Sequence, residues 1–172
     1  MSATKTGAAS ACADFDADVA IVGGGPVGTF LAILLGRQGK RVTLIERWTQ
    51  SYGRPRAVTY DHEIARLLAV LGIDSENDPA ISYHDELYYW KDANRENLQI
   101  VDWQSTSASG WRVRYRFNQP ALEERLTGIA SSYTNITQIR GFDAVGLQQD
   151  ADSATLTLKR TAAEDPNSTE TR

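Results

Sequence analysis

A glycine-rich turn between two apolar runs is the part of this chain best suited to bind a ligand. The turn GGGPVG runs from Gly23 to Gly28, and glycines at 23, 25 and 28 fit the G-x-G-x-x-G spacing. In that spacing the first glycine allows a tight turn, the second lets the backbone approach a pyrophosphate, and the third lets a helix pack on the preceding strand. Pro26 suits the first helical turn, where its missing N–H is not needed. The free N–H groups and the positive end of the helix dipole would then face an anion.

A carboxylate follows at the distance that a ribose site requires. Glu46 lies 18 residues after Gly28 and ends the second apolar run. It can accept hydrogen bonds from a ribose diol, and it would repel the additional phosphate of NADP. The alternative is a glycine-rich loop without a ligand. Because the strand, the turn, the helix and the acid occur in the right order, we predict a dinucleotide site, with FAD and NAD both open at this point.

The elements that would position these residues follow from apolar patterning. Val19 to Val22 predicts a strand, the segment after the turn predicts a helix, and Val42 to Glu46 predicts a second strand. Further patterns predict helices at 60–71 and 119–133, and strands at 87–90, 98–103, 111–117, 136–139, 142–148 and 154–158. We expect 136–139 to be a third strand of a parallel sheet. The predicted fold class is α/β, a Rossmann-like domain with a parallel sheet and a β-meander.

Two of these segments carry further signals. Asp61 is a candidate N-cap for the helix at 60–71, and Gly72 could end it. The strand at 111–117 alternates strictly, with Arg112, Arg114 and Arg116 on one face. We interpret that row as a solvated strand face; the alternative is that one arginine binds an anionic substrate group or an NADPH phosphate.

Composition argues against several classes of partner. The chain has 172 residues, 41% of them hydrophobic and 23% charged, which is ordinary for a soluble globular domain. A net charge of −4 without a basic cluster argues against nucleic acid. Cys12 is the single cysteine, and His62 and His84 are too isolated for a metal cluster, so we predict no metal site. We interpret the two histidines as surface residues rather than catalytic bases.

The chain carries no signal for membrane insertion or secretion. No stretch reaches the ~18 unbroken apolar residues of a membrane span, and the N-terminus lacks the apolar segment of a signal peptide. We therefore expect a cytoplasmic protein with no membrane partner. Residues 1–17 and 161–172 are small or polar, and we expect them to be disordered.

Several segments, taken together, resemble one family. The GGGPVG turn, Glu46-Arg47, the RPRA sequence from Arg54 to Ala57 and a helix opening with Gln119 occur in this order. That order resembles the start of class A, single-component FAD-dependent aromatic hydroxylases of the para-hydroxybenzoate hydroxylase type. The stretches RPRAVTYDHEIARLL and GWRVRYRFNQPALEERL are most similar to the 3-(3-hydroxyphenyl)propionate hydroxylase branch. The resemblance extends from about Asp18 to Lys159.

The resemblance implies FAD as cofactor, NADH or NADPH as co-substrate, and hydroxylation of a small phenolic ring with O₂. It implies these cofactor contacts: a pyrophosphate cradle from Gly23, Gly25, Pro26, Val27 and Gly28; Glu46 on the adenosine ribose; Arg47 beside the adenine; Arg56 near the pyrophosphate; Gln119 near the ribityl chain; and backbone atoms of Phe142 on the adenine. The catalytic residues stay unknown.

The resemblance also implies a division of the chain and an incomplete site. An FAD-binding domain would comprise 18–75 and 117–160, with the first strands of a substrate-domain sheet at 76–116. Members of the family are longer, and they carry a later Asp-Gly segment at the pyrophosphate and a Gly-Asp segment at the ribitol, neither of which occurs here. We therefore expect the N-terminal part of an aromatic monooxygenase, inactive alone, with a missing C-terminal part as partner.

Two other functions stay open. One is a non-catalytic module, or pseudo-enzyme, that binds FAD or ADP. The other is an NAD-dependent dehydrogenase, which the RPRA sequence and the strand-rich stretch after residue 80 fit poorly.

Overall fold

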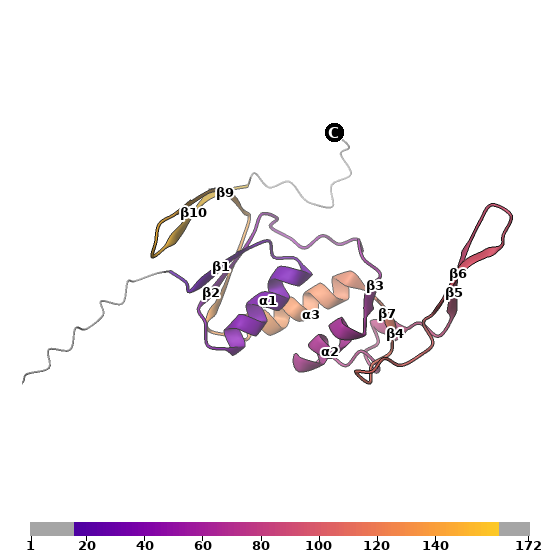
Figure 1. Ribbon diagram of the computed structural model, residues 1–172. Helices are drawn as coiled ribbons and strands as arrows, with labels where there is room; N and C mark the ends of the chain where they lie inside the picture. The colour runs from indigo at the N-terminus through magenta and orange to yellow at the C-terminus, as the bar shows by residue number, and fades with distance from the viewer. Residues whose placement is uncertain (1–15, 162–172) are drawn as a thin grey trace, which may run out of the picture.

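The computed structural model describes residues 16–161, and its elements are labelled in Figure 1. The predicted disordered segments, 1–17 and 161–172, lie almost wholly outside the described residues. In chain order the elements are β1 (Val19–Val22), α1 (Pro26–Arg37), β2 (Val42–Glu46), β3 (Thr59–Asp61), α2 (His62–Val70), β4 (Ile81–Tyr83), β5 (Leu87–Lys91), β6 (Asn97–Asp102), β7 (Arg114–Phe117), α3 (Gln119–Ser131), β8 (Ile136–Arg140), β9 (Phe142–Gln149) and β10 (Ala154–Arg160).

A parallel sheet of three strands, in the order β1-β2-β8, carries the glycine turn. Val22 pairs with Ile45, and Glu46 pairs with Arg140, so the carboxyl ends of the three strands lie at one edge. Open α/β sheets bind their ligands beyond that edge. The predicted parallel arrangement of the three strands, and with it the α/β fold class, is confirmed.

Helices α1 and α3 lie side by side against this sheet (Figure 1). Ile33 of α1, Leu126 of α3 and Val42 of β2 are each 1% exposed or less and belong to one apolar core. The helix–sheet contact is close at Gly36, where an added Cβ would lie 2.6 Å from Cδ1 of Ile136. The sheet edge is therefore held by a well-packed core.

A second, antiparallel sheet of order β3-β7-β4 packs beside α2. The rings of Tyr60 and Tyr115 stack across it with centroids 5.3 Å apart. The Tyr60 hydroxyl donates to Oγ of Ser75 at 2.8 Å, and burial raises the pKa of Tyr60 to about 12. This tyrosine therefore stays protonated at physiological pH, and its hydrogen bond is part of the core.

The predicted helix at 60–71 begins later than expected. Tyr60 pairs with Tyr115 in the second sheet, so the first residues of the segment are extended. The predicted N-cap is confirmed, because Oδ1 of Asp61 accepts from the N–H groups of residues 63 and 64, both at 3.1 Å. Gly72 follows the helix with a φ of +79°, a conformation that ends helices with glycine.

The predicted strand at 111–117 is wrong in its first half. Arg112 forms an isolated bridge with Thr106, and a turn around Gly110 precedes it. The continuous strand is β7, which pairs on both sides with β3 and β4. Strict alternation identified the paired end of the segment but not the point at which the chain leaves the sheet.

The predicted hairpin of β5 and β6 projects from the rest of the molecule (Figure 1). Large apolar side chains are exposed along it: Leu87, Tyr88, Tyr89, Trp90, Leu98 and Ile100. Within the described residues, no helix is long and apolar enough to cross a membrane, and none of the described His, Cys, Asp and Glu side chains group as a metal site.

Candidate functional site

The glycine turn is closed by a backbone contact that requires glycine at two positions. Gly23 has a φ of +107°, and its N–H donates to the carbonyl oxygen of Ile45 at 2.8 Å, which joins the turn to β2. At Gly28, an added Cβ would lie 1.9 Å from the carbonyl oxygen of Gly23. The third glycine of the motif therefore lets α1 start directly against the turn.

Thr29 fixes the turn from inside. Its hydroxyl donates to the carbonyl oxygen of Gly24 at 3.1 Å, and its N–H donates to that of Gly25 at 3.0 Å. The Thr29 side chain is buried, so these bonds are shielded from water. Sequence reasoning did not select Gly24 or Thr29, because Gly24 occupies a variable position of the motif and Thr29 lies just after its last glycine.

The outer side of the turn is open. An added Cβ at Gly23 or Gly25 would meet no atom within 4 Å, and Val27 is 83% exposed. Helix α1 starts at Pro26 with neither a capping side chain nor an acidic residue in its first turn. Its first N–H groups and the positive end of its dipole thus face open space beside a Cβ-free backbone, which fits a pyrophosphate.

Glu46 lies against the turn at the end of β2. Its Oε2 accepts from the N–H of Gly24 at 2.7 Å, and its Oε1 accepts from the N–H of Trp48 at 2.9 Å. Each carboxylate oxygen has a second lone pair, so both can still accept from a ribose diol. The two backbone bonds hold the carboxylate at the carboxyl edge of the sheet, next to the open turn.

The loop after β2 and the junction between β8 and β9 meet at the same edge. Gly141 has a φ of +77°, and its added Cβ would lie 3.1 Å from Cγ2 of Thr49. Arg47 is exposed, with its guanidinium 4.5 Å from the Trp48 ring centre. Phe142 is half-buried at the start of β9. The predicted adenine contacts of Arg47 and Phe142 stay predictions, and both residues lie on segments that flank Glu46.

Arg56 and Gln119 come together although 63 residues separate them. Oε1 of Gln119 accepts from the N–H groups of Arg56 and Ala57, both at 2.8 Å. Nε2 of Gln119 donates to Oε1 of Glu123 at 2.6 Å. The Arg56 guanidinium is exposed and lies 4.8 Å from the Tyr52 ring centre. The predicted cofactor contacts of both residues stay predictions; Glu123 was missed, although its spacing of four residues from Gln119 in a helix was available.

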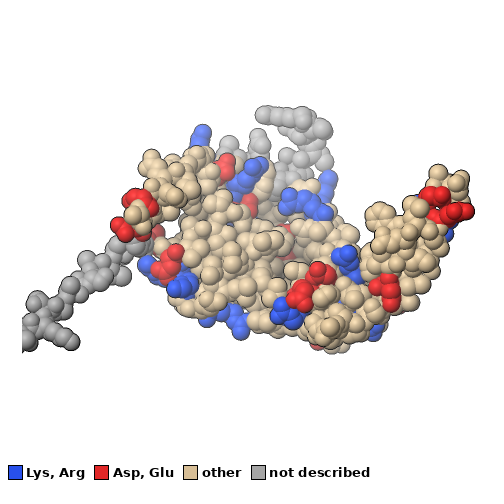
Figure 2. Space-filling view, viewed as in Figure 1, with Lys and Arg blue, Asp and Glu red and all other residues tan. Residues whose placement is uncertain are grey.

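Charged side chains of both signs are spread over the face shown in Figure 2. The prediction that Arg112, Arg114 and Arg116 form a solvated strand face holds for Arg116, which is exposed, but not for the other two. Arg112 and Arg114 are half-buried and lie over aromatic rings, at 4.3 Å from the Tyr83 centre and 5.0 Å from the Trp103 centre. Arg116 pairs with Glu86. These arginines hold the hairpin region to β7 through ion pairing and cation–π contacts.

The interpretation of His84 as a surface residue is wrong, because it is 8% exposed. Arg116 lies at both of its ring nitrogens, at 3.0 and 2.9 Å. Burial, followed by the positive charge of Arg116, lowers the pKa of His84 below its ordinary value. The fold therefore favours the neutral ring over the protonated one.

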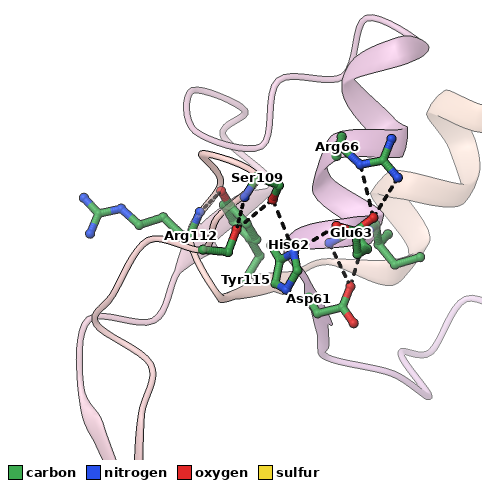
Figure 3. Close-up of polar contacts among 9 residues, drawn as sticks. Asp61, His62, Glu63, Arg66, Ser109, Arg112 and Tyr115 are labelled. Atoms are coloured by element: carbon green, nitrogen blue, oxygen red, sulfur yellow. Dashed lines mark hydrogen bonds and ion pairs between the residues drawn. The ribbon is translucent and has the colours of Figure 1, made fainter.

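One cluster in Figure 3 has the residue types of a nucleophile, a base and an acid. Oγ of Ser109 lies 3.3 Å from Nδ1 of His62, and Oε1 of Glu63 lies 3.2 Å from the same nitrogen. A working triad needs the serine and the acid on different ring nitrogens. The cluster therefore lacks the geometry of nucleophilic catalysis, and Glu63 is also bound by Arg66 on the next helical turn.

Comparison with known proteins points to one kind of domain. A family model described as an FAD binding domain matches residues 16–169. The probable NADH-specific resorcinol 4-hydroxylase of Rhodococcus jostii is 36% identical over 136 residues, which are 78% of this chain and 26% of that protein. A 3-(3-hydroxy-phenyl)propionate/3-hydroxycinnamic acid hydroxylase of Burkholderia vietnamiensis is 31% identical over 143 residues, covering 82% of this chain and 22% of that one.

A solved structure shares the fold. The p-nitrophenol 4-monooxygenase of Pseudomonas putida superposes with a TM-score of 0.69 at 24% identity, covering 83% of this chain and 36% of that chain. The chain thus spans about a quarter of the length of the curated relatives.

Proposed function

Because the chain belongs to the FAD binding domain family, we propose that it forms the part of a flavin-dependent aromatic monooxygenase that binds the ADP group of the cofactor. The membership, the FAD cofactor and the similarity to 3-(3-hydroxyphenyl)propionate hydroxylases, all predicted from the sequence, are confirmed by the family match and the relatives. The residue roles and the activity of the whole enzyme belong to the proposal.

One observation carries the assignment of the ligand. The open, Cβ-free face of the glycine turn lies next to Glu46, which is bonded to Gly24 at 2.7 Å. An anion-binding helix terminus and a diol-binding carboxylate are thereby held side by side, as the pyrophosphate and ribose of an ADP group require. The same arrangement fits FAD, NAD and free ADP, and the family match selects FAD.

The residues of this chain would bind and orient the cofactor. The first-turn N–H groups of α1 would hold the pyrophosphate, and Glu46 would accept from the ribose hydroxyls. Arg56, exposed on its loop, would add positive charge near the phosphates. Bound FAD would supply the oxygen chemistry, which side chains cannot perform.

The reaction proposed for the complete enzyme is hydroxylation of a phenolic ring with NAD(P)H and O₂. The supporting observation is the kinship with the resorcinol and 3-(3-hydroxyphenyl)propionate hydroxylases. The name of the first relative includes NADH specificity, so we propose NADH as the first donor to test. The three-quarters of the relatives' length that this chain does not span would contribute the flavin-ring and phenol contacts.

A titration with three nucleotides tests the binding assignment. Calorimetry of the chain with FAD, ADP and FMN should give binding of FAD and ADP with affinities within about tenfold, because both carry the ADP group. FMN, which lacks that group, should bind far more weakly. Equal binding of FMN and FAD, or no binding of ADP to the folded chain, would contradict the proposal.

A second measurement tests the activity. NADH and NADPH oxidation is followed with resorcinol and with 3-(3-hydroxyphenyl)propionate, and hydroxylated product is measured separately. Product formed by this chain alone would contradict the assignment of the flavin-ring contacts to a further segment. Binding of FAD without product is the expected result.

A further inference from the structure

The side chain of Gln119 is bound at both ends by the protein itself. Its carbonyl oxygen accepts from two successive backbone N–H groups, those of Arg56 and Ala57, at 2.8 Å each. Its amide nitrogen donates to Glu123 at 2.6 Å. Gln119 and Glu123 are 5% and 8% exposed, so the two side chains lie inside the molecule, whereas Arg56 and Ala57 lie at its surface.

We propose that Glu123 is a positioning residue for the cofactor site, which acts through Gln119 to hold the loop that carries Arg56. The inference rests on the proposed function, in which Arg56 lies near the pyrophosphate. Glu123 itself touches neither the glycine turn nor the loop in any hydrogen bond of the described residues; its bond is to Gln119.

The argument depends on the two ends of an amide being chemically different. The oxygen of Gln119 can accept from both loop N–H groups, whereas its NH₂ group would face them as a third donor. In isolation the two orientations of the amide differ little, because they have the same shape. The Glu123 carboxylate accepts but cannot donate, so it selects the orientation in which the NH₂ points at itself and the oxygen points at the loop.

The helix supplies a rigid base for this pair. Gln119 and Glu123 are four residues apart in α3, which places them on one face. The helix start is fixed by Asn118, whose Oδ1 accepts from the N–H of Ala121 at 3.2 Å. Arg56 and its neighbours are exposed and belong to an irregular segment between β2 and β3. The bonds to Gln119 therefore tie an irregular loop to the buried face of α3.

Amide hydrogen exchange at Arg56 and Ala57 tests the inference without any ligand. In Glu123→Ala we expect both amides to exchange about tenfold faster or more, because the Gln119 amide is free to turn. Glu123→Gln, whose carbonyl can still accept from Nε2, should restore exchange to within about twofold of the wild type. The matched control is Glu124→Ala, the exposed neighbour on the same helix, which should leave both amides unchanged.

The exchange rates of amides in β2 and in the middle of α3 distinguish a local effect on the loop from a general loss of stability. In Glu123→Ala these amides should exchange at the wild-type rate. Unchanged exchange at Arg56 and Ala57 would overturn the inference, as would equal acceleration throughout β2 and α3, or failure of Glu123→Gln to restore protection. These readouts hold whether or not the chain binds FAD.

Calorimetry with FAD then connects the loop to the site. Glu123→Ala should raise the FAD dissociation constant about threefold to tenfold, with Glu124→Ala and Glu123→Gln close to the wild type. If the wild type binds no FAD, the proposed function fails while the exchange result still decides the role of Glu123. If the wild type binds FAD and Glu123→Ala binds equally well despite a loosened loop, the link from Glu123 to the cofactor site is wrong.

Discussion

The carboxylate of Glu46 accepts a hydrogen bond from the backbone N–H of Gly24 at 2.7 Å, across 22 residues of sequence. The contact is close enough that an added Cβ on Gly24 would lie 2.9 Å from Cβ of Glu46. The acid at the end of β2 and the turn after β1 therefore form one unit. A ligand that uses the carboxylate must also lie beside the turn.

We expect Glu46→Gln to weaken binding of both ADP and FAD by about 10- to 100-fold. Hydrogen bonds to charged groups contribute about 1.5–3 kcal/mol, and the new NH₂ group would face a backbone donor on one side. The measurement is calorimetry with each nucleotide. Glu124→Gln is the control for loss of a carboxylate, and equal affinities in Glu46→Gln and the wild type would contradict the ribose role.

Two glycine-to-alanine changes in helices should have opposite effects on stability. Gly28→Ala places a Cβ 1.9 Å from a backbone oxygen and should destabilise the fold by about 1–3 kcal/mol. Gly128→Ala in α3 meets nothing within 4 Å and should stabilise it by about 0.5–1 kcal/mol. Denaturant unfolding of both variants measures the free energies. A change of the same sign in both would show that close packing at the turn does not determine the effect.

The sequence was sufficient for the parts of the fold set by local patterns. The apolar runs at β1, β2 and β8 and the spacing of the glycines predicted the sheet edge, because each of these signals is contained within a few consecutive residues. β3 and β4 were missed because each has three residues, and each depends on pairing with β7 from a distant part of the chain.

The contacts of the site depend on tertiary structure more than the helices and strands do. The bond between Gly24 and Glu46 needs the register of β1 on β2, and the bonds of Gln119 need a loop 62 and 63 residues away. A buried glutamate such as Glu123 is unusual, because carboxylates are seldom buried without a partner. The sequence shows that Glu123 lies four residues after Gln119 in a predicted helix, but it does not show that Gln119 binds the loop at Arg56 and Ala57.

The stability of the domain should fall as the pH drops below the ordinary histidine pKa. Burial, and then the charge of Arg116, lower the pKa of His84 in the folded protein, with Glu86 opposing them. The unfolded chain therefore binds a proton at higher pH than the folded one does, so the free energy of unfolding rises with pH between the two pKa values. The stabilising contribution is complete above about pH 6.5 and is lost as the pH falls through the lower, folded pKa.

Thermal unfolding of the wild type and of His84→Gln between about pH 7.5 and 5.5 measures this slope. The variant should show a flatter dependence in this window. At the upper end of this pH range His84 is largely neutral in both the folded and the unfolded wild type. The difference between the two proteins there therefore gives the change in stability caused by the substitution itself. Parallel curves for the two proteins would remove His84 as the source of the slope.

Arg56 and Arg54 provide the sharpest test of the loop's role in binding. Both are exposed and lie two residues apart, so a diffuse electrostatic effect would make them equivalent. We expect Arg56→Ala to weaken binding of FAD and ADP about tenfold, because Gln119 fixes the backbone of Arg56 and we propose that its guanidinium lies near the pyrophosphate. Arg54→Ala should change either affinity by no more than about twofold, since within residues 16–161 no such hydrogen bond fixes the backbone of Arg54. The dissociation constants are measured at low and at high salt, and the difference between the two variants should persist at both. Equal losses that vanish together in high salt would show that the loop contributes net charge and not a positioned guanidinium.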